Sequence, residues 1–220
     1  MHAIILAAGR GERMRPLTDA MPKPLLDING KPLIQYHVEN LVRAGINQIV
    51  INHGVYCDQI EKYLGDGSRF QANLVYSAEG NAPLETGGGI YRALPLLGEG
   101  PFLALNADIW TDYPFQSLLS NPPGLAHLVL VANPEHNPAG DFAIQDAYLT
   151  NRGARLYTFS GIGVYRKGLF QGQAGGVFPL TPLIRQAADK HQVTGEMYAG
   201  AWTDIGTPER LNKLRQQIQE

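Results

Sequence analysis

Two glycines and four cationic residues lie close together near the start of the chain. The apolar run 3–8 predicts a buried strand, and Gly9 and Gly11 follow it. The cationic residues are Arg10, Arg13, Arg15 and Lys23. Backbone N–H groups of a glycine loop can surround an anion while neighbouring cations neutralise its charge. This stretch therefore predicts a polyphosphate site, whereas the glycines alone would indicate only a tight turn after a strand.

The glycine pattern differs from two well-known phosphate loops. The sequence Gly-x-x-x-x-Gly-Lys-Ser/Thr is absent, which excludes a P-loop of the usual form. In the dinucleotide-binding pattern, a third glycine would stand at the position of Met14. Pro16 also interrupts the helix that should begin there. The predicted phosphate site therefore belongs to another class of loop.

The elements that must position this loop alternate between strands and helices. Strands are predicted at 3–8, 48–52, 74–77, 102–105, 125–132, 142–145, 161–165 and 199–204. Helices are predicted at 33–42, 58–64, 86–97 and 182–190, and from Pro208 onwards, where Thr207 can act as the N-cap. This order predicts an α/β fold, Rossmann-like, with a mixed, mainly parallel sheet flanked by helices. Ligands of such sheets bind beyond the carboxyl ends of the strands.

The length of 220 residues suits one domain. We expect two halves within it, about 1–110 with the phosphate site and about 111–220 with a C-terminal helix. The net charge of −2 lacks the positive excess that is typical of proteins that bind nucleic acid. Cys57 is the single cysteine, which excludes an internal disulfide and a cysteine-based zinc cluster. No signal peptide, membrane span or protein-partner motif is evident, so we expect a cytoplasmic protein.

A long motif in the N-terminal stretch resembles a known family. It reads Leu6-Ala-Ala-Gly-x-Gly-x-Arg13-Met-x-Pro16-Leu-Thr and is followed by Pro22-Lys23-Pro24-Leu25. This signature is similar to that of the sugar-phosphate nucleotidyltransferases, which have the nucleotide-diphospho-sugar transferase fold. These enzymes join a nucleoside triphosphate to a sugar 1-phosphate and release pyrophosphate. Such a reaction needs positioning and charge neutralisation more than an activated nucleophile, because the attacking phosphate is already an anion.

The resemblance implies that about 1–110 is the nucleotide-binding half and about 111–220 the sugar-binding half. It also implies roles for residues on the nucleotide side. The loop residues Ala8, Gly9, Gly11 and Glu12 would contact the nucleotide. Arg13 would face the leaving phosphates and Lys23 the α-phosphate, so these two are the catalytic candidates. The segment 79–89 resembles the base-reading loop, with Glu85 where relatives often have glycine, and its candidates are Asn81, Glu85 and Gly88. An amide suits a pyrimidine edge, although the segment could also be a plain flexible loop.

Two aspartates are candidate ligands for Mg²⁺, the cofactor that the resemblance implies. Asp108 follows a predicted strand in Asn106-Ala-Asp108, and Asp204 lies in Trp202-Thr-Asp204-Ile-Gly206-Thr-Pro208, which resembles a second family motif. Carboxylates at neighbouring strand ends can bracket one magnesium ion. The alternatives are an aspartate that caps a turn and a turn that enters a helix. Asp112 and Asp141 are weaker acidic candidates.

For the sugar, the resemblance points to Asn106, Asp141, Ser160 and Gly161. The segment from Ser160 to Tyr165 is similar to the strand that closes the sugar site in relatives. The relatives' Glu-Lys-Pro segment, whose lysine holds the sugar phosphate, is missing here. Arg152 or Arg155 could take its place, or both could be surface residues, and we choose Arg155 as the candidate.

Within the family, this chain most resembles the members that transfer a uridylyl group to N-acetylmuramate α-1-phosphate in cell-wall recycling. The implied substrates are UTP and that sugar 1-phosphate. Alternatives on the same scaffold are a mannose-1-phosphate guanylyltransferase and a phosphocholine-type cytidylyltransferase. Alternatives of another class are an NAD-dependent oxidoreductase and an inactive nucleotide-binding regulator. The incomplete glycine pattern and the absence of a Tyr-x-x-x-Lys pair count against the oxidoreductase, and the two aspartates with Lys23 count against the regulator.

Overall fold

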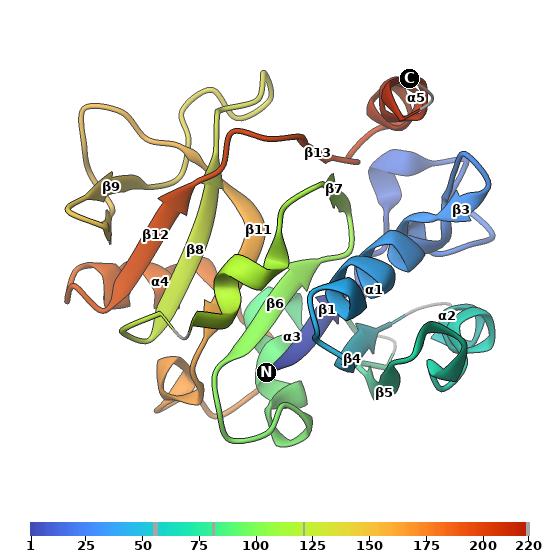
Figure 1. The fold of residues 1–220 in the computed structure, drawn as a ribbon, viewed down its shortest axis with the longest axis horizontal. Helices are drawn as coiled ribbons and strands as arrows, with labels where there is room; N and C mark the ends of the chain where they lie inside the picture. The colour runs from blue at the N-terminus through green and yellow to red at the C-terminus, as the bar shows by residue number, and fades with distance from the viewer. Residues whose placement is uncertain (55–56, 81, 121, 219–220) are drawn as a thin grey trace.

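A nine-stranded sheet runs through the computed structural model, which describes residues 1–54, 57–80, 82–120 and 122–218 (Figure 1). The strand order is β5-β4-β1-β6-β11-β8-β12-β10-β9. The bounds are β1 His2–Leu6, β4 Gln48–His53, β5 Asn73–Ala78, β6 Phe102–Asn106, β8 Ala126–Val131, β9 Ala143–Gln145, β10 Tyr148–Thr150, β11 Thr158–Tyr165 and β12 Val193–Met197. Two short pairs accompany the sheet: β2 Asp27–Ile28 with β3 Lys31–Pro32, and β7 Ile109–Thr111 with β13 Trp202–Asp204.

The first half of the chain supplies a run of parallel strands. β5, β4, β1 and β6 are neighbours in this run and point the same way. β11 then runs antiparallel to both β6 and β8, while β12 is parallel to β8. The predicted class, a mixed and mainly parallel sheet flanked by helices, is confirmed. The carboxyl ends of the parallel strands meet at one edge, as expected for this architecture.

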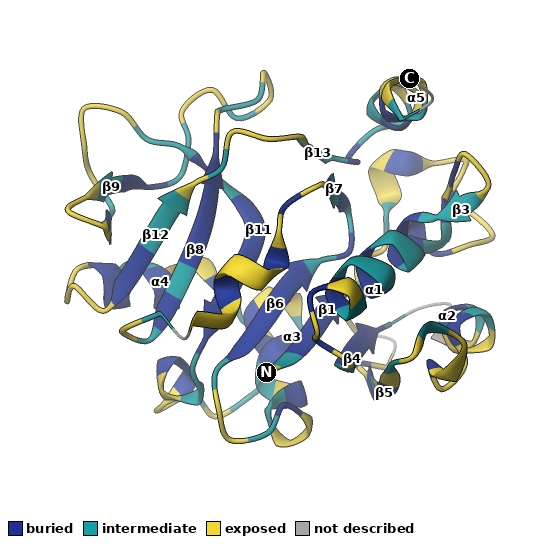
Figure 2. Cartoon of the chain, in the orientation of Figure 1, coloured by how far each residue is buried: buried dark blue, intermediate teal, exposed yellow. Residues whose placement is uncertain are grey.

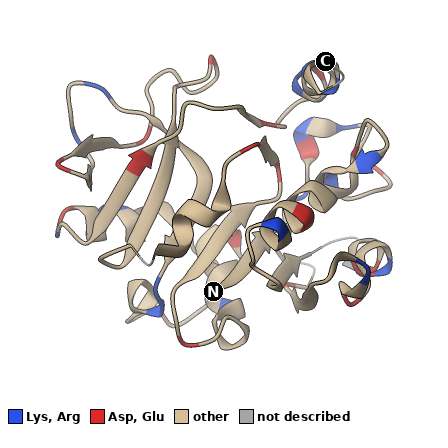
Figure 3. Cartoon of the chain, viewed as in Figure 1, with Lys and Arg blue, Asp and Glu red and all other residues tan. Residues whose placement is uncertain are grey.

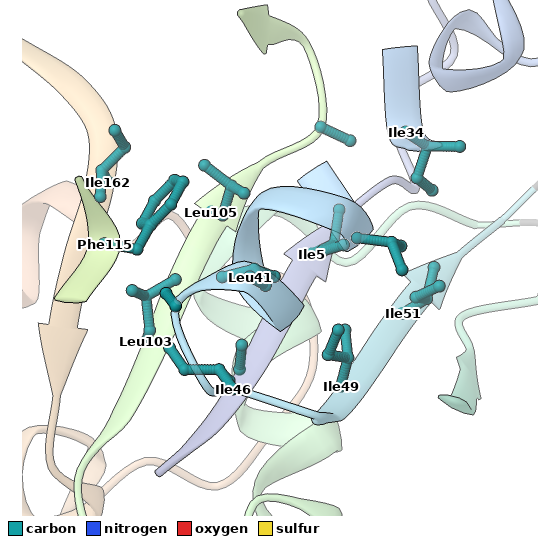
Figure 4. Packing of buried hydrophobic residues seen from close by; sticks show 14 of the residues in the cluster. Ile5, Ile34, Leu41, Ile46, Ile49, Ile51, Leu103, Leu105, Phe115 and Ile162 are labelled. Atoms are coloured by element: carbon teal, nitrogen blue, oxygen red, sulfur yellow. The ribbon is translucent and has the colours of Figure 1, made fainter. Parts of the chain in front are cut away.

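Helices cover both faces of the sheet (Figure 1). Their bounds are α1 Leu33–Arg43, α2 Cys57–Leu64, α3 Glu85–Ala93, α4 Thr181–Ala188 and α5 Pro208–Gln217. Alternate residues of a strand point to opposite faces, so Ile5 packs with α1 and α2 while Ile4 packs with α3 and α4. Figure 4 shows the first of these clusters, with Ile34 and Leu41 of α1 lying over the central strands. The central strands are accordingly buried (Figure 2).

A third apolar cluster joins the C-terminal helix to the N-terminal loop. Thr207 is the N-cap of α5 and accepts a hydrogen bond from the Arg210 N–H, and Pro208 takes the first helical position, as predicted. The cluster consists of Met14, Leu26, Ile28, Leu33, Ile205, Leu211 and Leu214. Met14 is 1% exposed within it. The end of the chain therefore supports the loop at its beginning.

The structure differs from the sequence-based expectation mainly in the second half. The strands β7, β10 and β12 were not predicted, because they are short and lack a clear alternation of apolar and polar residues. The expected helix 86–97 ends at Ala93 and continues as a 3₁₀ turn over Leu94–Leu96, since Pro95 lacks the N–H that an α-helix requires.

Charged residues are placed away from the central strands. β1, β6, β8 and β11 contain no lysine, arginine, aspartate or glutamate, and the charges lie on loops, helices and other strands, such as β3 and β12 (Figure 3).

Within the described ranges, no helix combines the length and apolar character that a membrane crossing requires.

Candidate active site

A cavity of about 620 Å³ lies at the carboxyl ends of the parallel strands. Leu6, the last residue of β1, is in register with Asn52 on β4 and with Asn106 on β6, so three neighbouring strand ends form its floor. The predicted loop residues Ala8, Gly9, Gly11, Glu12 and Arg13 line it, together with Lys23, Glu85, Asn106 and Asp108. The structure therefore brings most of the predicted nucleotide-side residues to one place.

The glycine loop is fixed by its own hydrogen bonds and by Met14. Gly11 has a φ of +65°, a conformation that favours glycine, and its carbonyl accepts hydrogen bonds from the Thr18 hydroxyl and the Met14 N–H, both at 2.8 Å. A Cβ added at Gly11 would lie 3.2 Å from the Cβ of Lys23. At Gly9, by contrast, an added Cβ would meet no atom within 4 Å. Gly11 thus shapes the loop, and Gly9 borders the cavity.

Lys23 and Asp108 form an ion pair in the wall of this cavity. The Lys23 Nζ lies 2.7 Å from the Asp108 Oδ2, and the side chains are 9% and 40% exposed, respectively. Pro22 and Pro24 hold Lys23 in a short 3₁₀ turn, in which the Leu26 N–H donates to the Lys23 carbonyl. The lysine is therefore held in place, and the aspartate retains an accessible side.

The β6–β7 turn that carries Asp108 is backed by a buried histidine. His37 of α1 is 1% exposed, and its ring lies close to the backbone of Ala107 and Ile109. Burial lowers the pKa of its imidazole to about 4, so the ring is neutral at pH 7. A neutral ring supports the turn without adding charge to the site.

Asp204 lies beside Asp108 across the β7–β13 pair. Asp204 is in register with Ile109, and the next residue, Ile205, donates its N–H to the Asp108 carbonyl at 2.7 Å. The Asp204 carboxylate accepts hydrogen bonds from Arg210 Nη1 at 2.5 Å, and His136 Nε2 lies 3.0 Å from its Oδ1. The backbones of the two predicted metal ligands are therefore close together, but Asp108 lines the cavity and Asp204 does not. Asp204 also has a cationic partner, Arg210, that the sequence did not reveal.

The donor chemistry at these aspartates fits a hard divalent cation. Mg²⁺ prefers oxygen ligands and is often bound by one or two carboxylates together with phosphates of the substrate. No group of three or more histidine, cysteine, aspartate or glutamate residues suited to a metal occurs in the described part of the chain. A magnesium ion at this place would therefore complete its coordination with substrate and water.

The segment after β5 forms the side wall of the cavity. Pro83, Glu85 and Thr86 line it, and Glu85 has a φ of +59°, a conformation that favours glycine. Asn81, a predicted base contact, lies outside the described residues. Glu79 and Asn52, which were not predicted, are buried polar residues in the same wall.

Gly88 does not reach the cavity, contrary to its predicted role. Its N–H donates to the Phe178 carbonyl at 3.0 Å, and an added Cβ would lie 2.1 Å from the Gly176 carbonyl oxygen. An added Cβ at Gly87 would meet the Phe178 ring at 2.5 Å. These glycines allow α3 to pack closely against the 176–178 segment, with the Phe178 ring at Gly87 and the Gly176 carbonyl at Gly88.

A second cavity of about 370 Å³ adjoins the first. The two share Leu6, Glu85, Thr86 and Asn106. The remaining lining residues are Phe159, Gly161, Tyr165, Pro179, Leu180, Thr181 and Ile184. Of the predicted sugar contacts, Asn106 and Gly161 belong here. Gly161 has a φ of +82°, and an added Cβ would lie 2.7 Å from the Asn106 Nδ2, so this glycine allows the amide to occupy its position.

Three other predicted sugar residues lie behind or away from this cavity. The Ser160 hydroxyl donates to the Val129 carbonyl, and the Asp141 Oδ2 accepts from the Phe159 N–H at 2.8 Å, so both support the wall. Arg155 packs over the Tyr157 ring and lines a separate hollow of about 460 Å³. Arg155 was chosen to replace a missing lysine, but the 151–157 loop directs it elsewhere.

The residues that sequence reasoning missed share one kind of signal. Asn52 follows the apolar run 49–51 near the carboxyl end of β4, and Glu79 directly follows β5. Polar residues at such positions can indicate a site at the strand ends. The apolar and aromatic lining of the second cavity gave no comparable signal, because the same residue types form ordinary core.

Comparison with known proteins agrees with this geometry. A sequence model of the nucleotidyl transferase family matches residues 2–144. The chain is 49% identical to the N-acetylmuramate alpha-1-phosphate uridylyltransferase of Neisseria meningitidis serogroup B, over 98% of this chain and 97% of that protein. It is 30% identical to the enzyme of the same name from Caulobacter vibrioides, over 94% and 92% of the two chains.

A solved structure shows the same fold. The inositol-1-phosphate CTP transferase from T. maritima matches with a TM-score of 0.83 and 20% identity, covering all of this chain and 96% of that one. At this identity the likeness concerns the fold alone, which is of the nucleotide-diphospho-sugar transferase type. The family match over most of the chain carries the activity class. This protein therefore belongs to the nucleotidyl transferase family and is a sugar-phosphate nucleotidyltransferase.

Proposed function

We propose that the protein transfers the uridylyl group of UTP to N-acetylmuramate α-1-phosphate, giving the UDP-sugar and pyrophosphate. The main support for the substrates is the 49% identity to a uridylyltransferase over nearly the whole of both chains. The two adjoining cavities that share Asn106 and Thr86 support the transfer itself, since the reaction needs two anionic substrates side by side. The product would enter peptidoglycan recycling, and the reaction would take place in the cytoplasm.

In this proposal the larger cavity holds UTP and the smaller one holds the sugar. A phosphate oxygen of the sugar 1-phosphate attacks the α-phosphorus of UTP and forms a new P–O bond. The bond from the α-phosphorus to the bridging oxygen breaks, and pyrophosphate leaves with that electron pair. The nucleophile is an anion at neutral pH, so no side chain has to remove a proton from it.

The cationic residues of the larger cavity would neutralise the charge that this displacement concentrates. Lys23 would face the α-phosphate, and Arg13 the leaving pyrophosphate. Lys23 is 7% exposed, so its charge acts where water screens it least. Fixed charges in such a place are among the larger contributions to catalysis. Backbone N–H groups of the glycine loop would contact the phosphates.

Asp108 and Asp204 would hold the magnesium ion, which supplies further positive charge to the phosphate oxygens when bound. The ion pair of Asp108 with Lys23 places the proposed metal ligand next to the proposed catalytic lysine. The partners of Asp204, the Arg210 guanidinium and the His136 ring, would have to share its oxygens with the ion.

The test is release of pyrophosphate from each nucleoside triphosphate paired with a panel of sugar 1-phosphates. We expect the highest kcat/KM with UTP and N-acetylmuramate α-1-phosphate, loss of activity with EDTA and recovery with excess Mg²⁺. Release with GTP and mannose 1-phosphate but not with UTP would overturn the substrate assignment. Release from no pair, with a folded protein, would favour a nucleotide-binding regulator.

A further inference from the structure

A buried carboxylate lies in the wall of the larger cavity without any role in the proposed chemistry. Glu79 is 7% exposed and directly follows β5. Its Oε1 accepts a hydrogen bond from the Asn52 Nδ2 at 2.6 Å, and its Oε2 accepts one from the Leu84 N–H at 2.8 Å. A buried carboxylate is costly unless hydrogen bonds satisfy both oxygens, and here backbone and side-chain donors do so.

Asn52 extends this contact to the phosphate loop. It is 3% exposed, and its Oδ1 accepts a hydrogen bond from the Ala7 N–H at 2.7 Å. Ala7 is the first residue after β1 and precedes the glycine loop. Three hydrogen bonds therefore lead from Ala7 through Asn52 and Glu79 to Leu84. Leu84 is the N-cap of α3, and its neighbours Pro83, Glu85 and Thr86 line the cavity.

The first turns of α3 leave space for this pair. An added Cβ at Gly89 would lie 2.4 Å from the Glu79 Oε1 and 2.6 Å from the Asn52 Nδ2. Glycine inside a helix is less favourable than alanine. We call the hydrogen-bonded Glu79–Asn52 pair the bridge. A glycine is needed where α3 passes the bridge, because any larger residue at position 89 would clash with these two side chains.

The bridge also explains why residue 79 is an acid and not an amide. Both of its partners are donors: the Asn52 amide N–H and the Leu84 backbone N–H. A carboxylate offers two acceptors, whereas a glutamine would direct its NH₂ group at one of the donors. Burial raises the pKa of the Glu79 carboxyl, and the two hydrogen bonds oppose this shift.

We propose that Glu79 and Asn52 are positioning residues that hold the 83–86 wall at a fixed distance from the phosphate loop. The inference rests on the proposed binding of the nucleotide in this cavity. In the bound enzyme the wall would contact the nucleoside while the loop contacts its phosphates. The bridge therefore affects whether the nucleoside and the phosphates can be bound at the same time. It should influence the affinity for the nucleotide more than the rate of the chemical step.

The test uses Glu79→Gln, Asn52→Asp and the double variant. Glu79→Gln places a donor NH₂ group against another donor, and Asn52→Asp places a carboxylate against the Glu79 carboxylate. For each single variant we expect KM for UTP to rise about tenfold, the effect of one impaired buried hydrogen bond. We expect kcat and the KM for the sugar 1-phosphate to stay close to the wild-type values. The exposed Glu99, which pairs with Lys167, provides the control Glu99→Gln, for which no constant should change.

The double variant restores complementary partners. An aspartate at position 52 can accept from both the Ala7 N–H and the glutamine NH₂, and the glutamine oxygen can accept from the Leu84 N–H. We therefore expect KM for UTP in the double variant to return to within about threefold of wild type, a clear departure from additivity. Thermal unfolding of every variant shows whether the changed constants come from loss of fold.

Any of three outcomes would refute the proposed role of the bridge. The first is an unchanged KM for UTP in Glu79→Gln, and the second is a KM for UTP in the double variant as high as in the single variants. The third is a change in kcat and in KM for the sugar 1-phosphate as large as the change in KM for UTP. The control for the underlying assignment is the wild type itself. A wild-type protein that neither binds nor uses UTP would refute the nucleotide assignment, whereas a working wild type with an insensitive Glu79→Gln would refute the bridge alone.

Discussion

Lys23 shows how one residue acquires a role from its surroundings. Among the cations of the larger cavity that the structure describes, only Lys23 is buried, whereas Arg10 and Arg13 are exposed. The flanking prolines and the Asp108 carboxylate hold its ammonium group at the cavity wall. A fixed charge of this kind is already oriented before substrate binds, so the reaction does not have to reorganise it.

Replacing Lys23 with alanine should lower kcat by about 10²–10³, the loss typical of one fixed electrostatic group. Lys31→Ala is the matched control, because Lys31 also forms an ion pair, with Glu39 at 2.6 Å, but does not line the cavity. Turnover of purified variants with UTP and the sugar 1-phosphate would be measured. Near-normal turnover of Lys23→Ala would show that the lysine does not act on the reacting phosphate.

The raised pKa of Glu79 predicts a pH effect on stability. Burial raises this pKa above the ordinary value of 4.5, so the folded state binds the proton more tightly than the unfolded state. Ionised Glu79 therefore lowers the free energy of unfolding at pH values above its folded-state pKa. This destabilisation disappears as the pH falls below 4.5, where the carboxyl is protonated in both states. The free energy of unfolding of the wild type should therefore increase relative to Glu79→Gln between neutral pH and pH 4, measured by urea unfolding. A constant difference would contradict this.

At the scale of elements, the glycine-rich start of α3 and the C-terminal helix both serve the cavity indirectly. Gly87 and Gly88 admit the 176–178 segment, and Gly89 admits the Glu79–Asn52 bridge. α5 packs Leu211 and Leu214 against Met14, which belongs to the phosphate loop. In the proposed mechanism the glycines of α3 and the helix α5 do not themselves contact a substrate, whereas Glu85 and Thr86 at the start of α3 line the cavity.

Leu211→Ala should lower the free energy of unfolding by about 2–5 kcal/mol, because Leu211 is fully buried and its loss leaves a cavity. It should also raise KM for UTP, since Met14 loses a packing partner. Leu119→Ala, at a residue that is 40% exposed, is the control. Chemical unfolding and steady-state kinetics measure both effects. Equal stability losses in the two variants would contradict the role of α5.

At the scale of the whole molecule, the sheet decides where the two substrates meet. The parallel strands β1, β4 and β6 end at the larger cavity. β11, antiparallel to β6, brings Gly161 beside Asn106, and α4 closes the smaller cavity with Thr181 and Ile184. The change of strand direction between β6 and β11 is thus where the two cavities adjoin.

The larger cavity draws on segments that are far apart in the sequence, from the glycine loop to Gly206. A ligand that binds only this assembled form should stabilise the whole fold. UTP with Mg²⁺ at 100 times its Kd should add about 2.7 kcal/mol, which corresponds to a rise in Tm of about 5–10 °C for a chain of this size. Calorimetry with GTP at the same concentration is the comparison. An equal rise with GTP would contradict the proposed base preference.

The sequence by itself determined the features that depend on local chemistry. Hydrophobic pattern and capping propensity predict features that depend on residues adjacent in sequence. These are the motif 6–25, the apolar strands of the first half, and the Thr207 cap with Pro208. Asp108 could be placed because it comes soon after the apolar strand β6, with only Ala107 between them. The short strands β10 and β12 gave no such signal, since they exist through pairing with distant partners.

The tertiary structure alone decided which distant residues meet. It joined Glu79 to Asn52, placed Arg210 on Asp204 and directed Arg155 into a separate hollow. It also assigned Gly88 to helix packing. These contacts depend on strand order and on how closely backbones approach, because a side chain's partners in space are set by packing across the whole chain and not by its neighbours in sequence.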